Sequence, residues 1–402
     1  MAKRYFKSTL LTVAALALSI GIGSNTTVIQ RTEAAAASAP CASGDHGLLQ
    51  NLQKKHAAAD QDPLHVTDVA FLSDTTGRAA GNGFLIGTSN GGCNWQEIYT
   101  GQWQFDQIVF PNNVDGWALA QISPEAPVKL IATKDGGSHW SILSTSGQQF
   151  KKIDVLGTDT IVGYTSNGAY KSLNGGTTWA KIKTPANTRA AVFTDQAARM
   201  GWSLTVHPGT GYKLHKTTSG GASWSTVLTI PFGTAFGGEL YSKGSQVWAL
   251  VYGESGMSQV SYSLYASHDS GSHWNRVIAQ STAGGGPAPG NGPALAYKGP
   301  ANPGGHPGNM QLIGRSTAYL AGGSPAGGKV GVGRSFDGGR SWSNIPAVLS
   351  GFDARISFPS ERTGWLAVTS PTQTAVYVTH DGGGSWNKKF SLPDAVSAKS
   401  SE

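Results

Sequence analysis

The eight residues TKDGGSHW at positions 133–140 decide the fold, because the same pattern returns along the whole chain. The pattern is Ser or Thr, any residue, Asp or a substitute, any residue, Gly, two variable residues and Trp. Its seven copies occupy residues 88–95, 133–140, 172–179, 217–224, 267–274, 335–342 and 379–386. Successive tryptophans lie 39 to 50 residues apart except for one gap of 68, and a period of about 45 residues is typical of a propeller blade. We therefore predict an all-β chain that forms a seven-bladed β-propeller of four-stranded antiparallel blades.

Each fixed position of the pattern has a physical role in a turn between two strands. The Asp carboxylate can accept backbone N–H hydrogen bonds, Gly permits a positive φ, and Trp carries a large apolar surface into the core. Asn or Ser replaces Asp in three copies, which keeps an acceptor oxygen but no charge, and a catalytic acid would not tolerate this change. The residues assigned this structural role are Asn90, Trp95, Asp135, Trp140, Asn174, Trp179, Ser219, Trp224, Asp269, Trp274, Asp337, Trp342, Asp381 and Trp386.

The domain organisation follows from the span of the repeats. Residues 65–392 are predicted to form the propeller, and the third repeat predicts strands over 151–156, 160–165, 169–172 and 178–183. Residues 38–64 are a connecting segment with a short helix near 48–56, and residues 393–402 are a disordered tail. The insertion 281–309 contains nine Gly and six Pro, so we expect either a disordered surface loop or a flap or binding arm that uses Tyr297, Lys298 and His306.

The repeats resemble Asp-box propellers, also called bacterial neuraminidase (BNR) repeats, over residues 65–392. Together with Gly-Trp pairs in the second strands, such as Gly116-Trp117, they look most similar to the photosystem II stability/assembly factor-like family. Sialidase, xyloglucanase and sortilin-type propellers are more distantly similar. The resemblance implies that the repeated turns are structural and lie on one face, while function belongs to loops around the central channel on the opposite face.

The N-terminal residues 1–37 are typical of a secretory signal peptide. Lys3, Arg4 and Lys7 precede an apolar run over 10–22, and small residues follow at 34–39. We expect cleavage after residue 37 or 39, with an uncleaved amphipathic anchor as the alternative, and no transmembrane span after processing because the run is short. The protein is predicted to be secreted, or to lie at the cell surface or in the periplasm.

Charge and cysteine content narrow the classes of partner. The net charge is +7, and residues 1–37 carry four basic and one acidic side chains, so it falls to +4 after processing. Because the basic residues are scattered, nucleic-acid binding is not expected. Cys41 and Cys93 are the only cysteines, and an exported protein can pair them in a disulfide. No clustered His or Cys spacing points to a metal, and no cofactor is expected.

Candidate ligand-binding residues stand near the predicted first strands, around the channel mouth. They are Trp103, Asp106, Lys151, Lys152, Arg189, Glu239, Asp353 and Arg355. One interpretation is that they only solvate the mouth and pair with one another. The other is a mixed-charge ring with an aromatic platform for a peptide or sugar.

The leading hypothesis is a non-enzymatic binding or assembly module that acts as a monomer on a protein or a cell-surface polysaccharide. No catalytic residues are assigned, because the three arginines and the Tyr/Glu pair of a sialidase are not visible. The alternative is a carbohydrate-active enzyme, either sialidase-like or another glycoside hydrolase. It would use mouth carboxylates such as Asp106, Glu239 and Asp353.

Overall fold

The computed structural model describes residues 41, 44–58, 64–166, 168–256, 259–299, 306–324, 326–370 and 373–393. The predicted signal peptide, the predicted tail beyond residue 393 and residues 300–305 of the insertion lie outside this part of the chain. Cys41–Glu402 belong to one compact unit. Among the described residues, no helix has the length and apolar character needed to cross a membrane.

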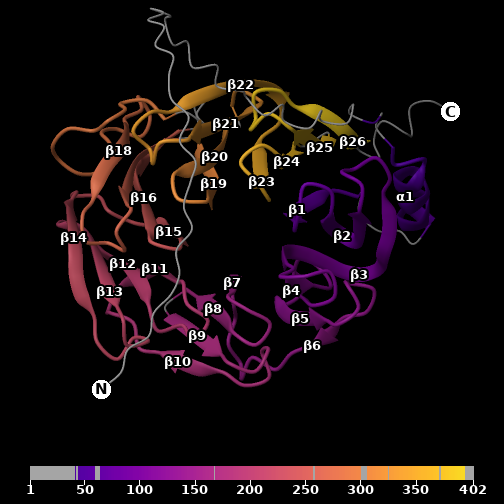
Figure 1. Ribbon diagram of the computed structural model, residues 1–402, viewed down its shortest axis with the longest axis horizontal. Coiled ribbons are helices and arrows are strands. Elements are labelled where there is room, and N and C mark those ends of the chain that lie inside the picture. Colours follow the sequence, from indigo (N-terminus) through magenta and orange to yellow (C-terminus); the bar gives the residue numbers. More distant parts are fainter. Residues whose placement is uncertain are drawn as a thin grey trace, which may run out of the picture. The chain divides into compact units, whose positions relative to one another are not determined.

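The described strands form six antiparallel sheets placed around a common centre (Figure 1). The first sheet contains β1 (Val66–Phe71), β2 (Gly77–Thr88), β3 (Gln96–Val109), β4 (Gly116–Gln121), β5 (Lys129–Thr133) and β6 (Ser141–Ile142). The second contains β7 (Lys152–Val155), β8 (Ile161–Thr165), β9 (Gly168–Ser172) and β10 (Ala180–Ile182), and the third β11 (Thr188–Phe193), β12 (Gly201–His207), β13 (Gly211–Thr217) and β14 (Ser225–Pro231). The fourth contains β15 (Gly238–Lys243), β16 (Gln246–Ser255), β17 (Val260–Ser267) and β18 (Asn275–Gln280). The fifth contains β19 (His306–Ile313), β20 (Thr317–Ser324), β21 (Lys329–Ser335) and β22 (Ser343–Ser350), and the sixth β23 (Asp353–Ser357), β24 (Gly364–Thr369), β25 (Gln373–Thr379) and β26 (Asn387–Pro393).

The protein is thus an all-β propeller of antiparallel, mostly four-stranded blades. Counted by hydrogen-bonded sheets within the described residues, it has six blades rather than the predicted seven. The difference arises at β3, which continues without a break where the sequence suggested the end of one blade. The first half of β3 pairs with β2 and its second half pairs with β4, so one sheet of six strands replaces two separate sheets.

The second strands of the sheets are buried on both sides, as their apolar sequences require. In β4 every residue from Gly116 to Ala120 is buried. Gly116 is needed there because a Cβ atom would lie 2.3 Å from the ring of Phe110. The same packing of Gly beneath a Phe ring occurs at Gly201 with Phe193. The Gly-Trp pair thus reflects close packing beside the end of the first strand.

The ring closes where the last sheet packs against the first. Phe71 of β1 stacks on Trp365 of β24 with ring centroids 3.9 Å apart, and its backbone N–H donates to the Ser357 hydroxyl at 3.0 Å. Helix α1 (Leu48–Ala58), where the sequence predicted a short helix, adds Leu49 and Leu52 to this core. A disulfide joins Cys41 to Cys93 and fastens the segment before α1 to the first turn.

The insertion after β18 packs on the outer strands of the fourth sheet over its described residues 281–299. Ser261 and Ser263 of β17 donate to the carbonyls of Gly285 and Pro289, at 2.6 and 2.7 Å. A short parallel bridge from Ala296 to Ile278 covers the open edge of β18. Residues 281–299 therefore pack against β17 and β18 of the fourth sheet. Their Gly and Pro content reflects close backbone contacts that sequence alone did not indicate.

Candidate functional site on the mouth face

The seven predicted turns share one set of hydrogen bonds, which defines one rim of the molecule. In each turn the first hydroxyl accepts the N–H of the fifth residue at 2.7–3.0 Å. The oxygen of the third side chain accepts the N–H of the seventh residue at 2.9–3.0 Å. The N–H of the fourth residue donates to the loop between first and second strands at 2.7–2.9 Å. We call this face the turn rim. The side-chain oxygens at the first and third positions of its turns accept backbone N–H groups and so stabilise the turn conformation.

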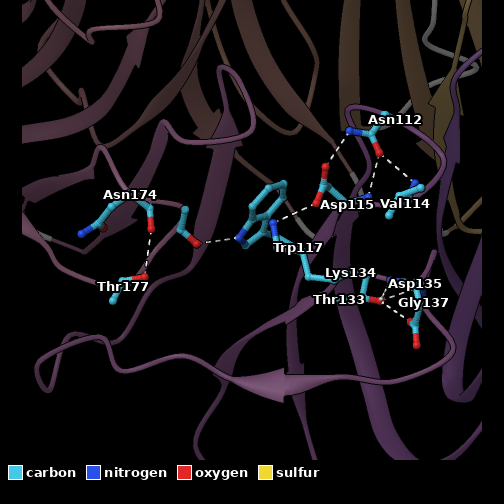
Figure 2. Close-up of polar contacts among 11 residues, drawn as sticks. Asn112, Val114, Asp115, Trp117, Thr133, Lys134, Asp135, Gly137, Asn174 and Thr177 are labelled. Carbon is cyan, nitrogen blue, oxygen red and sulfur yellow. Dashed lines mark hydrogen bonds and ion pairs between the residues drawn. The ribbon is translucent and has the colours of Figure 1, made fainter.

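Figure 2 shows how the turn rim links neighbouring repeats. The Trp117 indole N–H donates to the carbonyl of Gly175 in the next turn at 3.1 Å. Asp115 accepts hydrogen bonds from Asn112 and from the Lys134 ammonium group, both at 2.8 Å. The Lys134 nitrogen also lies 5.5 Å from the Trp117 ring centroid. Asp115 and Lys134 are therefore paired with each other, which fits a structural role.

Electrostatics of the turn carboxylates point the same way. The His139 backbone N–H and then its ring lower the pKa of Asp135 far below its ordinary value, and His273 acts likewise on Asp269. The two imidazoles are exposed and contact these carboxylates at 2.6 and 2.5 Å. Within the described residues, no three His, Cys, Asp or Glu side chains are grouped so as to hold a metal ion.

The opposite end of the sheets, which we call the mouth face, is where the first strands begin. The turns bond to the loops that end the first strands, so the starts of these strands point away from the turn rim. Lys152, Arg189, Glu239 and Asp353 each occupy the first or second position of β7, β11, β15 and β23. These strands form the inner edges around the centre (Figure 1). The structure thus places these four charged candidates at equivalent positions of different strands.

Trp103 does not belong with this group, although the sequence suggested it as an aromatic platform. Only 9% of its surface is exposed, and it packs in a core cluster with Leu85 and Phe105. The reason is again the unbroken β3, which fixes the phase of its side chains and directs Trp103 inward.

The charged candidates on the mouth face do not pair with one another. Of the eight, only Lys152 forms an ion pair among the described residues, at 3.4 Å from Asp154 of its own strand. The other charged candidates, Asp106, Lys151, Arg189, Glu239, Asp353 and Arg355, are exposed. Partial burial raises the pKa of Asp106 above its ordinary value. Apart from Lys152, these charged candidates therefore have no ion-pair partner among the described residues.

Glu239 stands in the most developed polar setting on the mouth face. Its carboxylate accepts hydrogen bonds from the hydroxyl groups of Tyr241 and Tyr252, the latter at 3.1 Å. Burial, and next the Glu239 charge, raise the pKa of both tyrosines well above its ordinary value. Both side chains pack against the cluster that contains Met310 of β19.

The sequence analysis missed both tyrosines. Tyr241 follows Glu239 by two residues and so shares its side of β15, a spacing that could have revealed it.

Asp68, on the inner strand β1, was also missed. One carboxylate oxygen accepts the Ile108 N–H and the other the Val69 N–H, both at 2.9 Å. Burial is the largest influence and raises the pKa of Asp68 to about 6, although these hydrogen bonds and the charge of Arg355 oppose it. Because Asp68 joins β1 to β3, its first role is structural.

Two hollows lie away from the mouth face. One of about 300 Å³ lies between α1 and β26, lined by Asp45, Leu49 and Lys389 among others. Another of about 220 Å³ lies beside Arg78 and the first turn. Neither hollow is lined by any of the eight candidates.

Comparison with protein-family models finds no match, and neither does comparison with curated proteins. Solved structures do match. "YCF48 bound to D1 peptide" has a TM-score of 0.50 at 16% identity over 80% of this chain and 94% of that chain. A GH74 xyloglucanase from Xanthomonas campestris has a TM-score of 0.55 at 14% identity over 80% of this chain, which spans about half (53%) of that enzyme. A prolyl endopeptidase structure matches with a TM-score of 0.52 at 6% identity, over 87% of this chain and 55% of its own. These likenesses establish the propeller fold.

Proposed function

We propose that this chain is an exported, non-enzymatic binding module that holds a protein or cell-surface glycan partner on its mouth face. The observation that carries the proposal is the difference in how the polar side chains of the two faces are used. The third side chain of every turn accepts a backbone N–H of its own turn, whereas the exposed mouth charges have no ion-pair partner among the described residues except Lys152. Exposed, uncompensated charges of both signs provide electrostatic complementarity for a partner.

The proposal also covers the number of Asp-box repeats and the family to which the chain belongs. We infer that the six-stranded sheet carries two of seven Asp-box repeats. In support, the first half of β2 pairs with β1 and its second half with β3, and the turn hydrogen bonds occur seven times. The likeness to YCF48, which was solved with a peptide bound, favours the photosystem II assembly factor-like group. Export would follow from residues 1–37, and the module would act as a monomer.

A peptide array and a glycan array test whether the mouth face binds a partner. The probe is the purified chain, and its control carries Asp106→Asn, Arg189→Gln, Glu239→Gln and Asp353→Asn together. We expect selected ligands to bind the wild-type chain and to lose most of their signal on the control. Ligands that bind both proteins equally, or no ligand on either array, would refute binding by the mouth face.

A glycoside hydrolase is the second candidate, and the Tyr241–Glu239 contact favours it. A Tyr/Glu pair is the nucleophile arrangement of sialidases, but among the described residues no arginine nitrogen lies within ion-pair distance of Glu239. Turnover of sialosides, xyloglucan or β-glucans that disappears on Glu239→Gln, Asp106→Asn or Asp353→Asn would replace the binding proposal with this one.

A further inference from the structure

The carboxylate of Glu239 is held ready to accept a ligand. Each oxygen already accepts one tyrosine hydroxyl, from Tyr241 and from Tyr252, so the group does not have to be ordered when a partner arrives. Fixing an interacting group beforehand lowers the entropy cost of binding. Glu239 nevertheless remains exposed, so its free lone pairs can reach a partner.

An exposed aromatic ring, Phe236, stacks on one of the two tyrosines that bind this carboxylate. The Phe236 ring is 50% exposed and stacks on the Tyr252 ring, with centroids 6.0 Å apart and planes 23° apart. The segment that carries Phe236 is fixed at two points. Phe236 N–H donates to the Tyr212 hydroxyl at 3.2 Å, and Tyr252 N–H donates to the Gly237 carbonyl at 3.0 Å. The exposed ring therefore sits on an anchored backbone.

The negative charge of Glu239 has no counter-ion among the described residues. Among the described residues, no Lys, Arg or His nitrogen forms an ion pair with Glu239. Carboxylates form their strongest hydrogen bonds with ammonium or guanidinium donors, and aromatic faces attract the same cations. An ammonium or guanidinium group can therefore interact with both the Glu239 carboxylate and the exposed aromatic ring.

We propose that Glu239, Phe236 and Tyr252 form a subsite for a Lys or Arg side chain of a protein partner. This inference rests on the proposed function and names the chemistry of its partner. A sugar could stack on Phe236, but its neutral hydroxyls would leave the carboxylate charge uncompensated. The observations therefore favour a basic polypeptide over a glycan.

Fluorescence anisotropy with defined peptides tests the subsite. The probes are fluorescein-labelled dodecapeptides of alternating Gly and Arg, or alternating Gly and Gln, titrated with the full chain at low ionic strength. We expect the Arg peptide to bind and the Gln peptide to bind far more weakly. Glu239→Gln should weaken Arg-peptide binding by roughly tenfold. Tyr252→Phe, which keeps the ring, should weaken it less.

Asp159→Asn is the matched control because it removes one exposed carboxylate on the turn rim, in the loop whose backbone carbonyl accepts the Gly175 N–H. It should change the affinity for the Arg peptide by less than about twofold. Thermal melting of each variant checks that the fold is intact. Equal losses in Glu239→Gln and Asp159→Asn, or no binding of the Arg peptide, would overturn the subsite.

The failure of the subsite can be told from the failure of the proposed function. Array peptides that bind the mouth face but are indifferent to Glu239→Gln would leave the function standing and remove the subsite. A glycan whose binding depends on Glu239 would also remove the subsite. The absence of any mouth-dependent ligand would remove both.

Discussion

The turn rim and the mouth face are opposite ends of the same strands, yet their polar groups behave differently. On the turn rim the same hydrogen bonds recur in every repeat, and a third-position Asp, Asn or Ser serves equally well. On the mouth face equivalent strand positions carry four different residues, Lys152, Arg189, Glu239 and Asp353. Repetition marks what every blade needs in order to fold, whereas variation leaves surface for a partner.

The largest effect should come from the packing between the last and first sheets. Trp365 is fully buried and stacks on Phe71, so Trp365→Ala should leave a cavity and cost about 3–5 kcal/mol of the free energy of unfolding. Urea unfolding measures this loss. Arg189→Gln, an exposed mouth change, should stay within about 0.5 kcal/mol, and equal losses would erase the distinction between the two regions.

A smaller loss is expected when the N-terminal anchor is cut. The disulfide between Cys41 and Cys93 closes a sequence separation of 52 residues. Replacing both cysteines by Ser should cost about 2–4 kcal/mol, because the unfolded chain regains freedom. The same urea experiment on the reduced wild-type chain should show a similar loss. An unchanged midpoint in both would mean that this anchor does not support the ring.

Contacts between the insertion and β17 should contribute to stability as well. Ser263 donates to the Pro289 carbonyl and accepts from the Arg276 guanidinium at 3.0 Å. Ser263→Ala leaves these partners unsatisfied and should cost about 1–3 kcal/mol. Tyr297→Ser is the control because its ring is largely exposed. If both variants unfold at the wild-type midpoint, the insertion contributes no stability.

Stability should also depend on pH through Asp68. Its pKa is about 6 in the folded chain and 3.8 ordinarily, so the folded state binds a proton first as the pH falls. The wild-type chain should therefore gain stability relative to Asp68→Asn as the pH falls from 7 to about 4. Urea midpoints of both proteins across this range measure the difference, and a difference of opposite sign would contradict the assigned pKa direction.

Local sequence patterns predicted the elements that depend on local chemistry. The third repeat was predicted to have strands over 151–156, 160–165 and 169–172, and β7, β8 and β9 lie at these places. The helix predicted near 48–56 is α1. Alternation and turn residues suffice here because neighbouring residues determine the outcome.

Features that depend on long-range packing escaped prediction. Separate blades were predicted for the first two repeats, but β3 is shared by both, which changes the sheet count and buries Trp103. The Gly- and Pro-rich composition of the insertion did not predict that its described residues 281–299 form hydrogen bonds with β17. The setting of Glu239 required Tyr252, which comes from another strand. None of these contacts is visible from spacing along the chain.

Unfolding and binding measured together on the fourfold mouth variant, Asp106→Asn, Arg189→Gln, Glu239→Gln and Asp353→Asn, show whether the mouth face binds a partner without supporting the fold. We expect a urea midpoint close to that of the wild-type chain, together with loss of binding to an array-selected ligand. A midpoint lowered as far as that of Trp365→Ala, or undiminished ligand binding, would contradict it.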